Sequence, residues 1–231
     1  MIKKYARLLR NNFTLNPKSI LFLVRHALTV WLLNIETKEQ FKSHYGEFNR
    51  GRDLRDYLLY NPGSEGGAII GDVVYFVQSV RLGDRPLLLA GDRNEVKDIW
   101  ARYFPKAQMV TCGIHEMDHY WNFEEPAPEA LSACRFGLII SQATIEHLID
   151  PYRHVSELAM LLDDDGVLVL HSVLPGFFYH RVPIDCFRFY PDWFEAIADR
   201  LGLIVLEKQI SVFNITYKYQ KVPDFCRSKS P

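Results

Sequence analysis

The chain has 231 residues, 48% of them hydrophobic and 24% charged, and a formal net charge of -1. This balance is ordinary for a folded globular protein, and the length suits one main domain with an accessory segment. A charge so close to zero does not favour nucleic acid as a partner. Four scattered cysteines without C-x-x-C spacing favour neither a zinc site nor a disulfide framework, so we expect reduced thiols in a cytoplasmic protein.

Residues 1–67 form a segment that is first basic and then polar. No acidic residue precedes Glu36, which is typical both of organelle-targeting peptides and of helices on membrane surfaces. The apolar run over residues 20–33 is shorter than the roughly 20 residues that a membrane span needs. We prefer helices that pack on the main domain or on a second subunit of a homo-oligomer. Pro and Gly in residues 61–67 indicate a linker.

From residue 68 onward, patterns of helices and buried strands alternate. Apolar periodicity predicts a helix over residues 68–80 and another over residues 94–104. Short apolar runs predict strands over residues 86–90 and 108–111, and a third strand with its loop over residues 118–123.

The second half continues this alternation. A strand is expected over residues 136–140, followed by a helix that opens at Pro151, where a missing N–H costs no hydrogen bond. The acidic run over residues 163–166 ends this helix, and the next strand covers residues 167–170.

The last elements are a helix and two strands. The helix runs from Pro191 to Gly202, where a left-handed cap is favoured. A buried strand is expected over residues 203–206. Alternation over residues 215–222 predicts a strand with one wetter face, and the polar residues 226–231 are expected to be disordered.

These elements predict an α/β fold with a doubly wound, mostly parallel sheet over residues 68–225. Strand–helix–strand units of this kind are right-handed, and their ligands bind beyond the carboxyl ends of the strands. For the two central strands, those ends are residues 141–147 and 171–180.

Two segments resemble a known family. LIISQATIEHLIDP, which ends at Pro151, precedes a helix and a VLVL strand, and resembles the second half of class I S-adenosylmethionine-dependent methyltransferases. His180-x-x-Pro-x-Asp185-x-x-Arg188 resembles a segment of methyltransferases of sugar and cell-surface polysaccharide pathways. The resemblance covers roughly residues 81–222. It implies a Rossmann-like sheet with an antiparallel last strand, N-terminal helices that form a lid or an interaction region, and O-methylation of a sugar or other small polar acceptor.

The resemblance also implies S-adenosylmethionine as cofactor, and its cofactor turn carries glycines spaced G-x-G-x-G. This chain has one glycine there, followed by Asp92. In the family, a carboxylate after the second strand binds the ribose hydroxyls, and here only Glu116 is close enough in sequence to take that place. Asn122 occupies the position of an acidic residue that lies near the adenine in the family. The implied cofactor positions are Ala90, Gly91, Asp92, Glu116, Asn122, Ser141, Gln142 and Glu146. Because three contact positions are altered, a second hypothesis is a non-catalytic relative that acts as a binding or scaffold partner.

Histidines on the expected ligand edge are candidates for removing a hydroxyl proton during methyl transfer. His180 is followed by Asp185, which could orient it, and by Arg188, which could bind an anionic group. The alternative is a structural Asp185–Arg188 ion pair. His147 is the second candidate base, the alternative being that Glu146 and His147 only cap the helix. His171 follows a buried strand and is expected to be a core histidine.

We expect no metal site from these patterns. The acidic residues 163–165 lack the spaced oxygen ligands of a calcium loop, and a solvated helix end explains them better. The aromatic residues over 177–193 could form a platform for an acceptor, although ordinary packing accounts for most of them.

Overall fold

The computed structural model describes residues 71–175, 177, 179–181, 183–210 and 214–222, together with Val24 and Leu28. The chain divides into two units, Met1–Glu47 and Phe48–Pro231, and the residues from Gly71 onward belong to the second. The predictions for the N-terminal helices, for the linker over residues 61–67 and for the tail therefore lie outside the described residues, apart from the two isolated positions. In the described part of the chain, no helix is long and apolar enough to cross a membrane.

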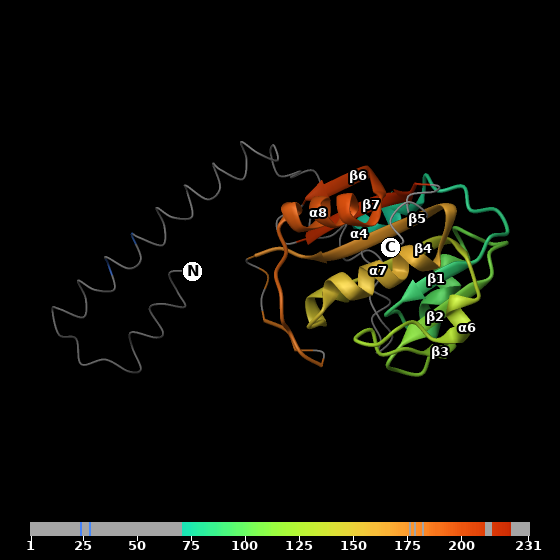
Figure 1. Ribbon diagram of the computed structural model, residues 1–231, viewed down its shortest axis with the longest axis horizontal. Coiled ribbons are helices and arrows are strands. Elements are labelled where there is room, and N and C mark those ends of the chain that lie inside the picture. The colour runs from blue at the N-terminus through green and yellow to red at the C-terminus, as the bar shows by residue number, and fades with distance from the viewer. Residues whose placement is uncertain are drawn as a thin grey trace, which may run out of the picture. The chain divides into compact units, whose positions relative to one another are not determined.

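One seven-stranded sheet organises the described part of the second unit (Figure 1). Its strands lie in the order β3-β2-β1-β4-β5-β7-β6, and β7 runs antiparallel to both of its neighbours while the other pairs are parallel. The predicted Rossmann-like sheet with an antiparallel last strand is confirmed. In chain order the strands are β1 (Leu87–Ala90), β2 (Met109–Gly113), β3 (His119–Tyr120), β4 (Phe136–Gln142), β5 (Leu162–Val173), β6 (Leu203–Ile210) and β7 (Asn214–Lys221).

The helices between these strands are short. The helix predicted over residues 94–104 is a 3-10 turn followed by one α-helical turn. The two longest described helices each begin with a proline at the first position, as predicted. The helical elements are α4 (Gly71–Val77), η1 (Asn94–Val96), α5 (Lys97–Trp100), α6 (Glu129–Ser132), η2 (Ile145–His147), α7 (Pro151–Leu161) and α8 (Pro191–Leu201).

Local chemistry explains where α7 begins and where α8 ends. Asp150 caps α7, because its carboxylate accepts a hydrogen bond from the Arg153 backbone N–H at 3.0 Å. Helix α8 ends at Gly202, which has φ of 65° and lies in the left-handed region that a residue without Cβ adopts most easily. The predicted cap at Gly202 is confirmed.

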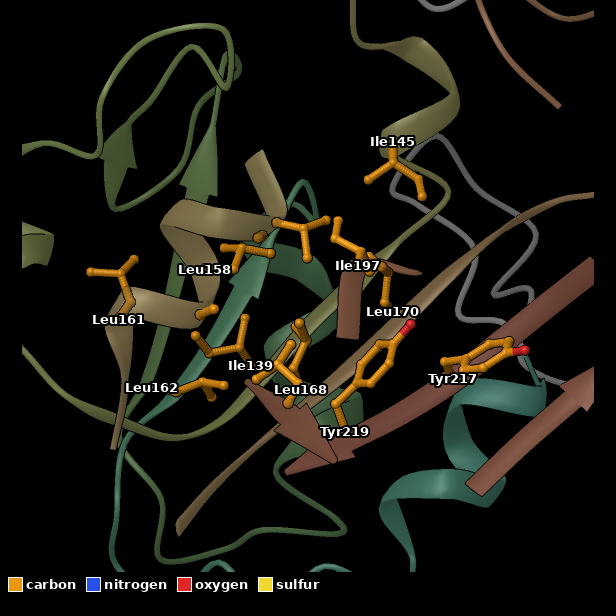
Figure 2. Close-up of a cluster of buried hydrophobic side chains, with 14 of the residues drawn as sticks. Ile139, Ile145, Leu158, Leu161, Leu162, Leu168, Leu170, Ile197, Tyr217 and Tyr219 are labelled. Carbon is orange, nitrogen blue, oxygen red and sulfur yellow. The ribbon is translucent and has the colours of Figure 1, made fainter. Parts of the chain in front are cut away.

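Two apolar clusters cover the two faces of the sheet. One contains residues of α4 and α5 with Leu87 and Leu89 of β1. The other contains residues of α7 and α8 with Leu88 of the same strand, as expected from the alternation of side chains along a strand. Figure 2 shows part of the second cluster, in which Leu168 of β5 lies near Tyr219 of β7. Burial on both faces fixes the central strands and therefore the loops at their carboxyl ends.

The structure corrects two predictions about the last strands. Leu203 is buried but residues 204–206 are not: β6 is an edge strand in which the side chains of Ile204 and Leu206 are 51% and 47% exposed. Strand β7 has no wetter face, because it lies between β5 and β6. Its Lys218 is buried, and the ammonium group donates to Glu207 at 2.6 Å and to Ser79 at 2.8 Å. The position of each strand in the sheet decides its burial more strongly than its own sequence pattern does.

Strand β5 is longer than expected. It begins at Leu162 rather than at Val167, so the acidic residues 163–165 belong to its first, irregular part. The register between β4 and β5 shifts there, after the pair Phe136 and Leu162. The helix therefore ends at Leu161, and the acidic residues that follow form the irregular first part of β5.

Candidate functional site

Three loops meet at the carboxyl edge of the sheet. They follow β1, β4 and β5, which are neighbours in the sheet, with Ala90 level with Ser141, and Gln142 level with His171. The strand order reverses at β1, and ligands of open α/β sheets bind at such a switch point. The strand ends at which the sequence analysis expected a ligand therefore lie side by side.

The turn after β1 packs tightly against the loop after β4. Gly91 has φ of 97°, and a Cβ at this position would lie 2.5 Å from the Thr144 Oγ1. The Gly91 backbone N–H donates to the Cys112 carbonyl at 2.9 Å, which ties the turn to the end of β2. Only glycine fits this position without displacing Thr144.

Asp92 lies next to this turn and is buried. Its Oδ1 accepts a hydrogen bond from Gln142 Nε2 at 2.8 Å, whereas its Oδ2 is buried with no hydrogen-bond partner among the residues that the structure describes. Burial raises the pKa of the Asp92 carboxyl to about 7, and the Gln142 hydrogen bond opposes this shift. Asp92 is therefore a carboxyl group that a cationic or hydroxyl-bearing ligand could satisfy.

The Asp92→Asn variant tests this burial. The native Asp92 holds its proton up to about pH 7 while the unfolded chain releases it near pH 4, so wild-type stability falls as the pH rises between these values. The neutral amide removes this dependence. At pH 8 we expect the free energy of unfolding of Asp92→Asn to exceed that of the wild type by about 4 kcal/mol, and at pH 4 we expect little difference.

Urea denaturation of both proteins at the two pH values measures this difference. Asp98→Asn, an exposed position on α5, is the matched control and should leave stability unchanged at both. A wild type that exceeds Asp92→Asn in stability at pH 8 would contradict the prediction.

The loop after β4 divides its side chains between the core and the edge. The Ser141 hydroxyl lies 3.1 Å from His154 Nε2 of α7, so it contacts the buried side of the helix layer rather than Asp92. Burial lowers the pKa of His154 to about 3 and keeps this imidazole neutral. Gln142 and Thr144 point toward the β1 turn, and Thr144 donates to the Gln142 carbonyl at 3.0 Å. The sequence analysis did not single out Thr144, although this uncharged residue lies within the LIISQATIEHLIDP segment.

Glu146 is fully buried in η2. Its Oε2 accepts a hydrogen bond from the Ser172 hydroxyl at 2.7 Å, whereas its Oε1 is buried with no partner among the described residues. Burial raises the pKa of this carboxyl. The Glu146 carbonyl accepts from the backbone N–H groups of Cys186 and Phe187, so η2 is held against the loop that follows β5.

Asp185 and Arg188 form a bidentate ion pair in the loop after β5. The Arg188 Nη1 donates to Asp185 Oδ1 at 2.5 Å and the Nη2 to Oδ2 at 2.7 Å, and the Asp185 side chain is only 1% exposed. The guanidinium holds the pKa of Asp185 well below its usual range. Oδ2 also accepts from the His180 backbone N–H at 2.7 Å. The pair therefore fixes the loop conformation and the position of His180. Its geometry is that of the structural ion pair that the sequence analysis gave as the alternative.

The two candidate histidines are neighbours. Their ring centroids lie 4.8 Å apart at an interplanar angle of 76°. The His147 Nδ1 is 2.5 Å from the Ile184 carbonyl oxygen, and the His180 Nδ1 is 3.5 Å from Asp185 Oδ2. Thus η2 and the loop after β5, which are far apart in sequence, bring two partly exposed imidazoles together.

The two candidate cofactor residues after β2 are Glu116 and Asn122. Glu116 is exposed, and only its backbone carbonyl makes a described contact, with Asn94 Nδ2 at 3.4 Å. Asn122 forms a local turn, because its Oδ1 accepts from the Glu124 backbone N–H at 3.2 Å. A Cβ at Gly113 would lie 2.8 Å from the Met117 sulfur, which fills this corner. The side chains of Glu116 and Asn122 make no described hydrogen bond to the other candidate residues.

His171 is the core histidine that the sequence predicts. It is fully buried, its Nε2 lies 3.2 Å from Asn214 Oδ1, and its Nδ1 accepts from the Ala143 backbone N–H at 3.3 Å. Burial lowers the pKa of His171 to about 4. It therefore supports the Ala143 backbone, whose φ of 47° is uncommon for a residue with a Cβ.

The aromatic residues of the loop after β5 divide between packing and exposure. Phe189 is buried in the core, where it packs on Trp193 and Phe194. Tyr179 is 72% exposed, and the Phe177 ring lies 5.1 Å from the His180 ring. Packing explains the C-terminal members of the group, while Phe177 borders the paired histidines.

A separate hollow, lined by Arg85, Asp165 and Lys218 among others, lies at the opposite end of the strands. Arg85 pairs with Asp165, and Lys218 pairs with Glu207. The first pair ties the loop before β1 to β5, and the second joins β7 to β6, so we assign the hollow to packing.

No protein-family model matches this chain, and no curated protein matches its sequence. Solved structures match through the fold. The [4+2]-cyclase SpnF has a TM-score of 0.52 and 12% identity, over 71% of this chain and 85% of that one. A SAM-dependent methyltransferase from Methanosarcina mazei has a TM-score of 0.52 and 10% identity, over 65% and 98%. One from Aquifex aeolicus has a TM-score of 0.50 and 12% identity, over 73% and 98%.

The chain has the class I methyltransferase fold. This follows from the strand order with its antiparallel β7 and from the structures that match it. A cyclase is among those structures, so the fold by itself does not assign a reaction.

Proposed function

We propose that this protein is a methyltransferase that uses S-adenosylmethionine and methylates an oxygen of a small polar acceptor such as a sugar. One observation carries the proposal: the glycine turn after β1, two buried carboxyl groups and two paired imidazoles all lie along the carboxyl edge of a methyltransferase-type sheet. A purely structural domain has no need to bury carboxylate oxygens without partners, because each costs free energy.

The β1 turn fits one half of the cofactor. Gly91 lets Thr144 pack directly against the turn, and Asp92 Oδ2 is a buried acceptor with no partner among the described residues, suited to an ammonium or hydroxyl group. The end of β2 fits less well, since Met117 fills the corner at Gly113. We therefore assign Gly91, Asp92 and Gln142 to the cofactor, with Ala90 ending the strand beneath them. Bound here, the cofactor supplies a methyl group on a sulfonium that a nucleophilic oxygen can displace.

The chain's own residues then position the acceptor and take its proton. His180 lies beside the ionised Asp185, which stabilises the imidazolium that forms when His180 accepts a proton. His147 lies at the same place and can contact the acceptor hydroxyl. Arg188 is already paired with Asp185, so its contribution is to orient this carboxylate. General-base assistance of this kind contributes about 10²–10⁴ in rate.

The test is a calorimetric titration with S-adenosylmethionine and S-adenosylhomocysteine. We expect a Kd near 1 μM, equivalent to about -8 kcal/mol. Gly91→Ala is expected to weaken binding about tenfold or more, because its Cβ displaces Thr144 and an alanine strains the positive φ. Ala130→Val on the exposed face of α6 is the control and should bind like the wild type.

Absence of binding by both compounds to a folded wild type would overturn the proposal. The non-catalytic binding or scaffold role would then be tested through protein partners. Where Gly91→Ala binds poorly, the double variant Gly91→Ala, Thr144→Ala separates the clash from the backbone strain, because it removes the hydroxyl that the new Cβ meets.

A further inference from the structure

Three side chains with metal-ligating atoms meet at the carboxyl edge of the sheet. Glu146 and His147 come from η2, and His180 comes from the loop after β5; one ligand atom of each lies within 4.8 Å of the others. We propose that this Glu146–His147–His180 cluster binds a divalent first-row transition metal ion through two imidazole nitrogens and one carboxylate oxygen. No metal site was expected from the scattered cysteines or from the acidic residues 163–165, and none of those residues belongs to this cluster.

The Glu146 carboxylate is held in one orientation, and one of its two oxygens has no partner among the described residues. Glu146 is fully buried, its Oε2 is occupied by the Ser172 hydroxyl at 2.7 Å, and Oε1 is left without a partner among the described residues. A buried carboxylate oxygen without a partner is costly, and a cation next to it removes that cost. Ser172 fixes the orientation of the carboxylate, as an outer hydrogen-bond partner of a metal ligand does.

Both imidazoles are held through Nδ1 by an oxygen acceptor. The Ile184 carbonyl, 2.5 Å from His147 Nδ1, can only accept, so Nδ1 carries the proton and Nε2 carries the lone pair. His180 Nδ1 faces Asp185 Oδ2 at 3.5 Å, which favours the same tautomer. An Nδ1–H held by a carbonyl or carboxylate is the arrangement that orients metal-binding histidines through Nε2.

The local charge also permits a cation. Arg188 interacts electrostatically with Glu146, but its two hydrogen bonds to Asp185 offset its charge. Glu146 then supplies the anionic ligand. Two imidazoles with one carboxylate suit Zn²⁺, Fe²⁺, Mn²⁺ or Co²⁺, whereas Mg²⁺ and Ca²⁺ prefer oxygen ligands throughout.

Modest movements would complete the site. Bonds of about 2.0–2.1 Å in a tetrahedral site set ligand atoms roughly 3.3 Å apart, so the side chains would close by up to about 1.5 Å. Both histidines are partly exposed, which leaves room for this movement.

Three protein ligands leave coordination positions open for a small molecule. A hydroxyl bound there loses its proton more easily, because the cation stabilises the oxygen anion. This role rests on the proposed methyl transfer, in which the ion would then replace an imidazole as the group that promotes proton loss. Metal binding itself does not depend on that reaction.

The test is binding of Zn²⁺ and Co²⁺ to the full chain after dialysis against a chelator. We expect one equivalent of Zn²⁺ by calorimetry with a Kd of 1 μM or tighter, and Co²⁺ absorption in the visible region typical of nitrogen and oxygen ligation. Glu146→Gln and His180→Gln should each weaken binding about 100-fold, and Ser172→Ala about tenfold, the range typical of outer partners. His115→Gln changes an exposed histidine after β2 and should bind like the wild type.

Thermal unfolding separates loss of the site from loss of the fold. Zn²⁺ should raise the Tm of the wild type and of His115→Gln, but not that of folded His180→Gln, because a ligand stabilises only the state that binds it. Absence of a saturable single site, or binding unchanged in Glu146→Gln and His180→Gln, would overturn the metal proposal. Titration of S-adenosylmethionine into the chelated protein tests the methyltransferase proposal separately.

Discussion

Replacing Leu168 by alanine is expected to lower the free energy of unfolding by about 3–4 kcal/mol. Leu168 is fully buried in β5 at the centre of the sheet, within the apolar cluster formed with α7 and α8 (Figure 2). The substitution removes buried methyl groups and leaves a cavity that densely packed neighbours cannot fill. Urea denaturation monitored by circular dichroism measures the change.

Leu206→Ala provides a matched control for the same chemical change. Leu206 is 47% exposed on the edge strand β6, so we expect a loss below about 1 kcal/mol. Equal losses for the two variants would show that the central strands are not packed as the structure describes.

Replacing Asp185 by asparagine is expected to lower the free energy of unfolding by about 2–3 kcal/mol at pH 7. The change removes the charge that Arg188 contacts through two hydrogen bonds, with Asp185 buried and Arg188 20% exposed. The pKa of native Asp185 is depressed, so its stabilising contribution is full above the unfolded value near 4 and declines as the pH falls below it. The stability gap between wild type and variant should therefore narrow between pH 5 and pH 3.

The same substitution should also affect the site. Asp185 faces His180 through both the imidazole and the backbone N–H, so its loss should reduce turnover about tenfold or more if the proposed reaction is assayed. Asp199→Asn on the exposed face of α8 is the control for both measurements. A pH-independent gap in stability would argue against an ionised, paired Asp185.

Most of the fold could be predicted from the sequence, because apolar runs and helix signals are local. Pro151, Pro191 and Gly202 marked helix ends by their backbone geometry alone. The burial of β6 and β7 could not be predicted, since it depends on which strand lies at the edge of the sheet. The alternation in β7 indicated a wet face, yet Lys218 is buried because Glu207 of β6 pairs with it.

Part of the candidate site could also be predicted, because the carboxyl ends of neighbouring parallel strands meet at one edge of the sheet. The strand-end rule placed His147 and His180 on one edge, and the structure brings their rings together. The orientation of Glu146 by Ser172 could not be predicted, because it requires the spacing between β5 and η2 in three dimensions. Glu116 and Asn122 were assigned by resemblance alone; in the structure the Glu116 carbonyl accepts from Asn94 of η1, and Asn122 forms a local turn.

The place of β7 between β5 and β6 governs the order in which the protein can fold. Strands β1, β4 and β5 can pair as they leave the ribosome, whereas β5 and β6 lack their shared partner until residues 214–221 have emerged. Until then both strands present open edges, and unpaired edges of incomplete sheets are prone to aggregation. Synthesis therefore passes through a vulnerable stage, and chaperone dependence should end only when the last strand of the sheet has inserted.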